Sequence, residues 1–255
     1  MISFTSEQLG IWLGTFFWPF ARLLALISSA PVLSHATIPA RVKISLAILV
    51  TLVIAPALPP PPASSLVSWN AIILLAQQIG IGLAMGFTLR LIFAAVEMAG
   101  DLVGLQMGIS FATFIDPQNS TQTPLIGSFL GIVASLVFLS IDGHLILLAA
   151  VSESFRVFPV GGDTASLASL KNIVRLGSVV FSIALHIALP ALTALRVCNV
   201  ALGVLTRAAP QLNLLSIGFP ITLLAGLWTL AAGMPWMTHA MQSYLERWPA
   251  RLPLQ

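Results

Sequence analysis

The chain has 255 residues, of which 58% are apolar and only 7% are charged. Soluble domains carry about 45–50% apolar and about 25% charged residues. The composition therefore excludes a soluble globular domain and a disordered chain, because neither could keep so much apolar surface in water. A single cysteine, Cys198, excludes a disulfide scaffold. The sequence predicts an integral membrane protein, and its net charge of +3 comes from too few groups to indicate a nucleic-acid partner.

Long uncharged runs favour a helical membrane protein over a β-barrel, whose strands alternate apolar and polar residues over about ten positions. No Asp, Glu, Lys or Arg occurs between Lys43 and Arg90, or between Arg207 and Glu246. These runs exceed the roughly 18 apolar residues that mark a spanning helix. The first apolar run, 9–31, is expected to be a retained span rather than a signal peptide, because no basic residue precedes it.

In chain order, the sequence predicts an all-α protein with about six long apolar helices in a single membrane-embedded domain covering 1–255. Each segment is close to the spanning length of about 20 residues or forms the core of such a span. The segments centre on 11–30, 44–57, 71–96, 124–151, 173–202 and 214–237. Between the second and third lies a proline-rich connector, about 56–62, which is expected not to be helical.

The distribution of cations gives no membrane topology. Lys and Arg should be in excess on the cytoplasmic side. With six spans, however, four cations fall on one side and five on the other: Arg41, Lys43, Arg196 and Arg207 against Arg156, Lys171, Arg175, Arg247 and Arg251. Either some segments do not cross the membrane, or partner subunits fix the orientation.

Two arginines, Arg22 and Arg90, lie in or beside apolar segments. An intramembrane charge costs about 2.5–3.5 kcal/mol on insertion scales, so it usually faces protein or a water-filled cavity. The alternative is that these long side chains reach the interface. The sequence leaves both interpretations open for each arginine.

The segment from Arg90 to Pro124 carries the most information. Gly100, Gly104 and Gly108 recur every four residues, a spacing that lets two helices approach closely. Glu97 and Asp101 are also four apart and share a helix face, where like charges repel. This pair therefore needs water, a cation or a partner's basic group, or else it belongs to a solvated helix end.

After Gly108 the helical pattern is expected to end. Asp116 precedes Pro117, which favours a turn, and small, amide and hydroxyl side chains surround Phe111 and Phe114. Such a segment is either an ordinary surface loop or an uncharged closure that folds into a pore. Composition alone favours the surface loop.

The sequence contains no motif that would support catalysis or a cofactor. HExxH, GxSxG, a phosphate-binding GxxxxGK and GxGxxG after a strand do not occur. Asp142 and His144 are near each other, but no third metal ligand is evident. We therefore expect no enzyme activity, no cofactor and no metal site.

Several motifs together resemble the FliR family of flagellar biosynthesis proteins (FliR/SctT-like), which includes the corresponding component of virulence injectisomes. These motifs are FFWPFARLLALISSAPVLSHATIPARVKISL (16–46), GLQMGISFATFIDP (104–117), FLSIDGHLILL (138–148), ESFRVFP (153–159) and RAAPQLNLLSIGFPITLLAGL (207–227). The resemblance runs from about Ser6 to Met237 in the family's order, and it is closer to the flagellar than to the injectisome branch. Any one motif alone would be weak.

This resemblance implies a non-catalytic subunit of the flagellar type III protein export gate. One copy would join several copies each of FliP and FliQ to form the channel for unfolded flagellar subunits. The export switch protein FlhB and FlhA would be further partners, in the basal body in the bacterial inner membrane. The implied fold is a FliP-like part joined to a FliQ-like part, with kinked hairpins raised out of the bilayer plane, which would explain the undecided topology.

The resemblance also implies that the loop matching 106–122 plugs the closed pore, and this reverses the preference for a surface loop. A pore wide enough for unfolded chains must not leak ions, and a mobile, uncharged, partly apolar loop can block it. The expected plug residues are Gln106, Met107, Gly108, Ser110, Phe111, Phe114, Ile115, Asp116, Pro117, Gln118 and Asn119. Two alternatives remain: a secondary transporter, whose helices are also broken by prolines, and a membrane scaffold without a pore.

Overall fold

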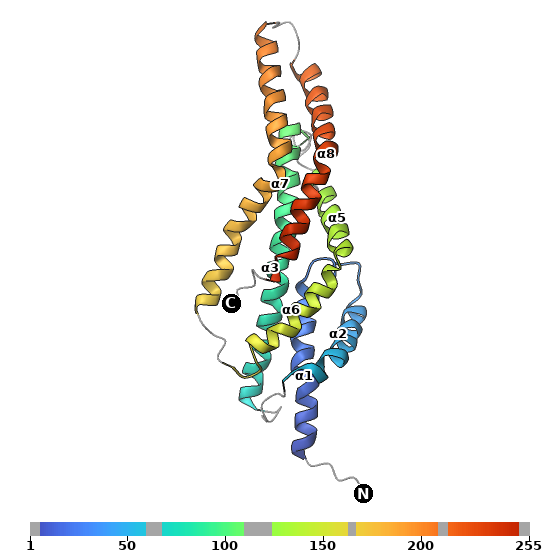
Figure 1. The fold of residues 1–255 in the computed structure, drawn as a ribbon, viewed down its shortest axis with the longest axis vertical. Helices are drawn as coiled ribbons and strands as arrows, with labels where there is room; N and C mark the ends of the chain where they lie inside the picture. The colour runs from blue at the N-terminus through green and yellow to red at the C-terminus, as the bar shows by residue number, and fades with distance from the viewer. Residues whose placement is uncertain (1–5, 60–67, 110–123, 163–166, 209–213, 250–255) are drawn as a thin grey trace, which may run out of the picture. The chain divides into compact units, whose positions relative to one another are not determined.

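The computed structural model describes residues 6–59, 68–109, 124–162, 167–208 and 214–249, and Figure 1 traces its helices. Within these ranges the structure consists of helices and turns, with no strand, which confirms the all-α prediction. The elements are α1 (Ser6–Ser29), α2 (Ala40–Ile54), the 3-10 turn η1 (Ala55–Ala57), α3 (Trp69–Met107), α5 (Leu125–Ser140), α6 (Gly143–Val157), α7 (Leu167–Ala208) and α8 (Leu214–Glu246).

Four of the described helical stretches are long and apolar enough to cross a membrane: Ala40–Ala57, Trp69–Met107, Gly177–Ala208 and Gly218–Glu246. The pair formed by α5 and α6 would make a fifth, and the apolar part of α1, Leu13–Ser29, is shorter. All six apolar segments expected from the sequence are therefore helical, but only four, or five with the broken pair, have the length and composition of a span.

The fourth apolar segment differs from the expectation, because it forms two helices instead of one. The chain breaks at Ile141 and Asp142, between α5 and α6. Asp142 adopts a left-handed conformation with φ of 53°, which aspartate tolerates better than most residues because its short polar side chain can bond locally. Gly143 then starts α6.

The proline-rich connector also differs from the expectation at its start. Pro56 lies inside η1, so the chain is still helical there. Proline fits this position because it stands in the first turn, where no backbone N–H has to be donated. Leu58 is extended, with ψ of 152°, as expected for a residue that precedes a proline. Residues 60–62 of the predicted connector lie outside the described residues.

The contacts of the chain group into two compact units, each assembled from separate segments. The first comprises Met1–Leu91, Asp142–Leu176 and Glu246–Gln255, and the second comprises Ile92–Ile141 and Gly177–Leu245. In the first unit the large fully buried side chains include Trp18, Leu23, Leu26, Met85, Leu89, Phe155 and Trp248; in the second they include Met107, Leu130 and Ile187. Both cores are built from the apolar faces of helices, since no sheet contributes to them in the described residues.

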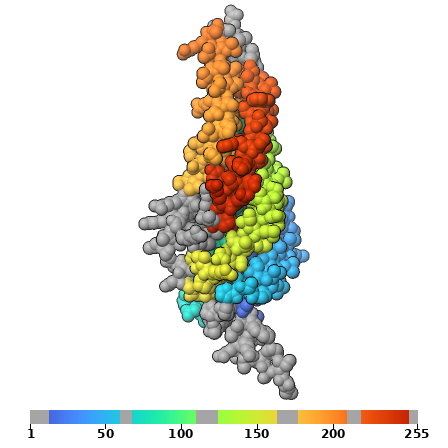
Figure 2. Space-filling view, viewed as in Figure 1, coloured from blue at the N-terminus to red at the C-terminus, as the bar shows by residue number. Residues whose placement is uncertain are grey.

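In the first unit, α2 lies on the outside, as its light-blue surface in Figure 2 shows. Only Ala47 and Thr51 of this helix are buried, while Leu52 and Val53 are 57% and 79% exposed. A contiguous apolar surface of this kind is rare on a soluble monomer. It suits a helix that lies against lipid or against another protein.

Candidate functional site

In the first unit, the Arg22 guanidinium is fully buried at the meeting point of α1, α3 and α6. Its Nε donates to Gln78 Oε1 at 2.8 Å, and its Nη1 donates to Ser154 Oγ at 2.9 Å. Its Nη2 donates to the carbonyl oxygen of Phe158 at 2.9 Å. One side chain therefore ties three helices together, and the structure places it in the interior rather than at an interface.

The groups around Arg22 stabilise its charge without a carboxylate. Ser154 and Phe158 belong to the last turn of α6 and the residue that caps it, where a helix carries the equivalent of about −0.5 elementary charge. The guanidinium carbon also lies 3.8 Å from the centroid of the Phe155 ring, a favourable cation–π geometry. The negative end of α6 and an aromatic face thus supply part of the counter-charge.

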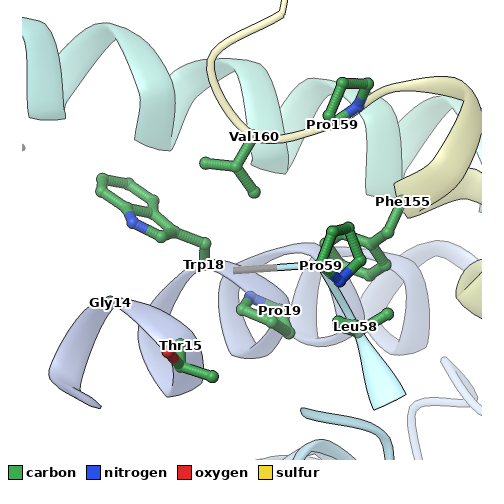
Figure 3. A pocket seen from close by; sticks show the side chains of 9 residues that line it. All are labelled: Gly14, Thr15, Trp18, Pro19, Leu58, Pro59, Phe155, Pro159 and Val160. Carbon is green, nitrogen blue, oxygen red and sulfur yellow. The ribbon is translucent and has the colours of Figure 1, made fainter. Parts of the chain in front are cut away.

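A small apolar cavity of about 40 Å³ lies in the same unit, and Figure 3 shows its walls. One side is formed by residues of α1, Gly14, Thr15, Trp18 and Pro19; Leu58 and Pro59 follow η1, and Phe155, Pro159 and Val160 close the other side. Phe155 is shared between this cavity and the Arg22 contacts. Gln77 holds the adjoining turn, because its Nε2 donates to the carbonyl oxygen of Gly162 at 3.0 Å.

In the second unit, α3 and α5 approach so closely that glycine is required at the contact. A β-carbon on Gly100 would lie 2.6 Å from the carbonyl oxygen of Ile126 and 2.7 Å from the Cα atom of Gly127. At Gly104 the nearest atom to such a carbon is 3.5 Å away, which is an ordinary contact. The close approach is therefore centred on Gly100.

The two predicted carboxylates of α3 lie beside the glycines of α5. A β-carbon on Gly127 would meet the Oδ1 atom of Asp101, and one on Gly131 would come within 3.0 Å of the Oε1 atom of Glu97. Asp101 is half-buried, its Oδ1 atom has no hydrogen-bond partner among the described residues, and Glu97 is exposed. Because Gly127 and Gly131 have no side chains, α5 leaves the space that these two carboxylates occupy.

The C-terminal end of α3, in the second unit, is formed by a left-handed glycine. The helix ends at Met107, and Gly108 follows with φ of 80°, a left-handed conformation that glycine adopts readily at the end of a helix. The Ile109 N–H donates to the carbonyl oxygen of Gly104 at 3.2 Å. The predicted end of the helical pattern at Gly108 is confirmed.

Contacts from α7 and α8 hold the last turn of α3. The Thr222 hydroxyl shares its hydrogen between the carbonyl oxygens of Phe219, at 3.0 Å in its own helix, and of Met107, at 3.3 Å. The fully buried Met107 side chain packs directly on Gly226. Asn199 Nδ2 lies 3.5 Å from Gln106 Oε1, at the limit of a hydrogen bond. The chain therefore leaves α3 from a point that is anchored on two sides.

Only three of the predicted plug residues lie within the part of the chain that the structure describes. Gln106, Met107 and Gly108 form the end of α3 just outlined. Ser110, Phe111, Phe114, Ile115, Asp116, Pro117, Gln118 and Asn119 lie outside the described residues. Of the predicted interior or interface charges, Arg22 is buried, Asp101 is half-buried, and Arg90 and Glu97 are exposed in the structure.

Sequence reasoning did not find the partners of the predicted residues. Gln78 and Ser154 are 56 and 132 residues away from Arg22 along the chain, and Thr222 is 115 residues from Met107. No local pattern marks these polar residues, because glutamine, serine and threonine also occur singly in many apolar helices. Their only sequence signal is a polar side chain within an apolar run.

Comparison with known proteins gives a consistent family. The family described as "Bacterial export proteins, family 1" matches residues 13–248. The flagellar biosynthetic protein FliR of Escherichia coli K12 is 45% identical over 238 residues, covering 92% of this chain and 90% of that protein. FliR of Pectobacterium carotovorum is 43% identical over 92% and 90%, and FliR of Bacillus subtilis is 30% identical over 79% of both chains.

Proposed function

Because this chain belongs to the bacterial export proteins, family 1, the family of the flagellar biosynthetic protein FliR, we propose that it is a non-catalytic subunit of the flagellar type III export gate. In this proposal one copy assembles with several copies each of FliP and FliQ into the channel for unfolded flagellar subunits. FlhB and FlhA are further partners, and the assembly lies in the basal body in the bacterial inner membrane.

Membership of this family is the observation that supports the proposal. The family matches residues 13–248, which is nearly the whole chain. The apolar surface of the chain agrees with it. Helices such as α2 expose large apolar side chains, Leu49 and Val53 among them, and in an assembly these would be covered by lipid or by neighbouring subunits. The relatives are named for flagellar biosynthesis and not for a reaction.

We also propose that the loop after α3 plugs the closed pore. A plug has to be displaced by cargo without loosening the helices that carry it. The anchoring of Met107 by Thr222 and Gly226 supports this role, because it fixes the base of the loop. Gly108 then turns the chain out of the helix.

Assembly is tested first. The chain is tagged, co-expressed with candidate FliP and FliQ partners, extracted in mild detergent and analysed by native mass spectrometry. We expect one copy of the chain within a larger mixed complex. Recovery of the chain alone or as a homo-oligomer, with both partners present but unbound, would contradict the proposal and favour a transporter.

The plug is tested in the assembled gate by comparing two variants. Deletion of 110–122 should leave the mixed complex intact but make the membrane leaky to ions. Replacement of the same residues by glycine and serine at equal length is the matched control, and it separates the loss of the apolar side chains from the loss of length. Normal ion permeability of the deletion variant in an assembled gate would exclude the plug.

A further inference from the structure

Arg22 carries a full positive charge in the interior of the first unit, yet every group that it contacts is neutral. Its partners are an amide oxygen, a hydroxyl oxygen, a carbonyl oxygen and an aromatic ring. Among the described residues, the acids in this unit form no ion pair with it; Glu153 instead pairs with Arg156 at the surface. The dipole of α6 supplies the equivalent of only about half a negative charge.

The hydroxyl of Ser154 cannot supply more negative charge. The Ser154 hydroxyl donates its own hydrogen to the carbonyl oxygen of Val151 at 2.6 Å. It therefore accepts from Arg22 through a lone pair of its oxygen. Buried charges in proteins are normally paired or bound to an ion of opposite charge, because an isolated one is costly. The surroundings of Arg22 thus leave part of its charge uncompensated.

Gln78 provides a second and independent observation. It is fully buried, and its Oε1 atom accepts from Arg22. This bond fixes the amide orientation, since the flipped amide would set one donor against another. The Nε2 atom is then left without an acceptor among the described residues. An orphaned buried donor of this kind calls for a bound water or ion.

From these two observations we propose that the cluster of Arg22 and Gln78 binds a single small monovalent anion, which in the cell would be chloride. The anion would accept from the Gln78 Nε2–H and from guanidinium N–H groups of Arg22 that the three bonds above do not use. It would provide the missing acceptor and the missing negative charge at once, whereas a water molecule would provide only the acceptor.

The chemistry of the site favours a small monatomic ion over a larger oxyanion. The donors lie deep among the side chains of α1, α3 and α6, and both side chains are fully buried. A polyatomic oxyanion would need donors for several oxygen atoms, whereas the cluster offers only the Gln78 Nε2–H and the guanidinium N–H groups that the three bonds leave unused. The proposal concerns this unit alone and does not depend on assembly of the export gate.

The first test is a titration of thermal stability with halide. The purified full chain is heated in detergent at constant ionic strength while chloride replaces gluconate, an anion too large for the site. We expect the midpoint of unfolding to rise with chloride and with bromide, by an amount on the order of 4 °C at saturating halide. A midpoint that does not change would overturn the proposal and assign the orphaned donor to water.

Two substitutions on α3 make the test specific. Gln78→Glu replaces the amide by a carboxylate of the same shape, which supplies the counter-charge from the protein itself. We expect this variant to fold and to lose the halide response. Asn70→Asp, at an exposed position of the same helix, adds the same charge outside the cluster and should keep the response. Equal halide responses in the two variants would show that the effect arises elsewhere.

A direct measurement locates the ion. Crystals of the chain or of its complex grown in bromide should show an anomalous peak within hydrogen-bonding distance of the Gln78 amide nitrogen, and crystals of the Gln78→Glu variant should lack it. Bromide peaks confined to the protein surface would contradict the proposal, even if halides raised the stability.

Discussion

Gly100 of α3 and Gly127 of α5 face each other with no room for a side chain between them. A β-carbon on Gly100 would lie 2.7 Å from both the Cα and the backbone nitrogen of Gly127. Real β-carbons do not approach backbone atoms so closely, so any side chain here must move a helix. The contact explains why small residues recur in this part of the sequence. Of the glycines on α3 in this unit, it is Gly100 rather than Gly104 that the close approach requires.

Gly100→Ala should therefore destabilise the second unit by about 1–3 kcal/mol, the usual cost of adding a methyl group to a closed contact. The midpoint of thermal unfolding in detergent measures the change. Gly104→Ala is the matched control, because its β-carbon meets Ile126 at 3.5 Å and alanine is the better helix former. Equal losses at the two positions would contradict the close approach at Gly100.

Gly108→Ala should cost about 1 kcal/mol, because a residue with a β-carbon is disfavoured at a φ of 80°. Hydrogen exchange of the last turn of α3 would report the loss as faster exchange near Met107. Gly203→Ala on α7 serves as the control, since a β-carbon there meets nothing within 4 Å. Unchanged exchange in the Gly108 variant would mean that the turn has another origin.

Arg22→Lys should lower the stability of the first unit by about 2 kcal/mol although the charge is kept. Lysine cannot reproduce the three separately directed bonds to Gln78, Ser154 and Phe158, and hydrogen bonds to charged groups contribute about 1.5–3 kcal/mol each. Thermal unfolding followed by circular dichroism tests this. Arg90→Lys, at an exposed position, is the control and should leave the stability unchanged. Full stability of the Arg22→Lys variant would indicate that only the charge of Arg22 matters.

Trp248→Phe should cost about 1 kcal/mol, and Trp248→Ala about 3–5 kcal/mol. The indole Nε1 donates to Thr88 Oγ1 at 3.1 Å, and the ring is 2% exposed. Phenylalanine keeps most of the packing but loses the bond, whereas alanine loses both. Denaturant or heat titration of the two variants separates these contributions. Similar losses would show that the hydrogen bond, and not the packing, dominates at this end of the chain.

Much of the secondary structure follows from the sequence, because its signals are local. Pro39 precedes the start of α2 and Gly108 follows the end of α3, and both residues act through their own backbone. The break at Asp142 was not predicted, since the apolar run continues on both sides of it and an aspartate next to a glycine also fits an exposed turn. Pro56 was assigned to an extended connector for a similar reason: proline is compatible both with an extended chain and with a first helical turn.

By itself, the sequence determined the class of the protein and its family. Runs of apolar residues without charges require a membrane or a protein environment for their helices, whatever their packing, and the family motifs are continuous in the chain. Only the tertiary structure decided which residues meet: that Arg22 lies on Phe155, that Gly100 and not Gly104 forms the close contact, and that Met107 packs on Gly226. These pairs are far apart along the chain, and whether they touch depends on the rotation and depth of whole helices, which no local pattern specifies.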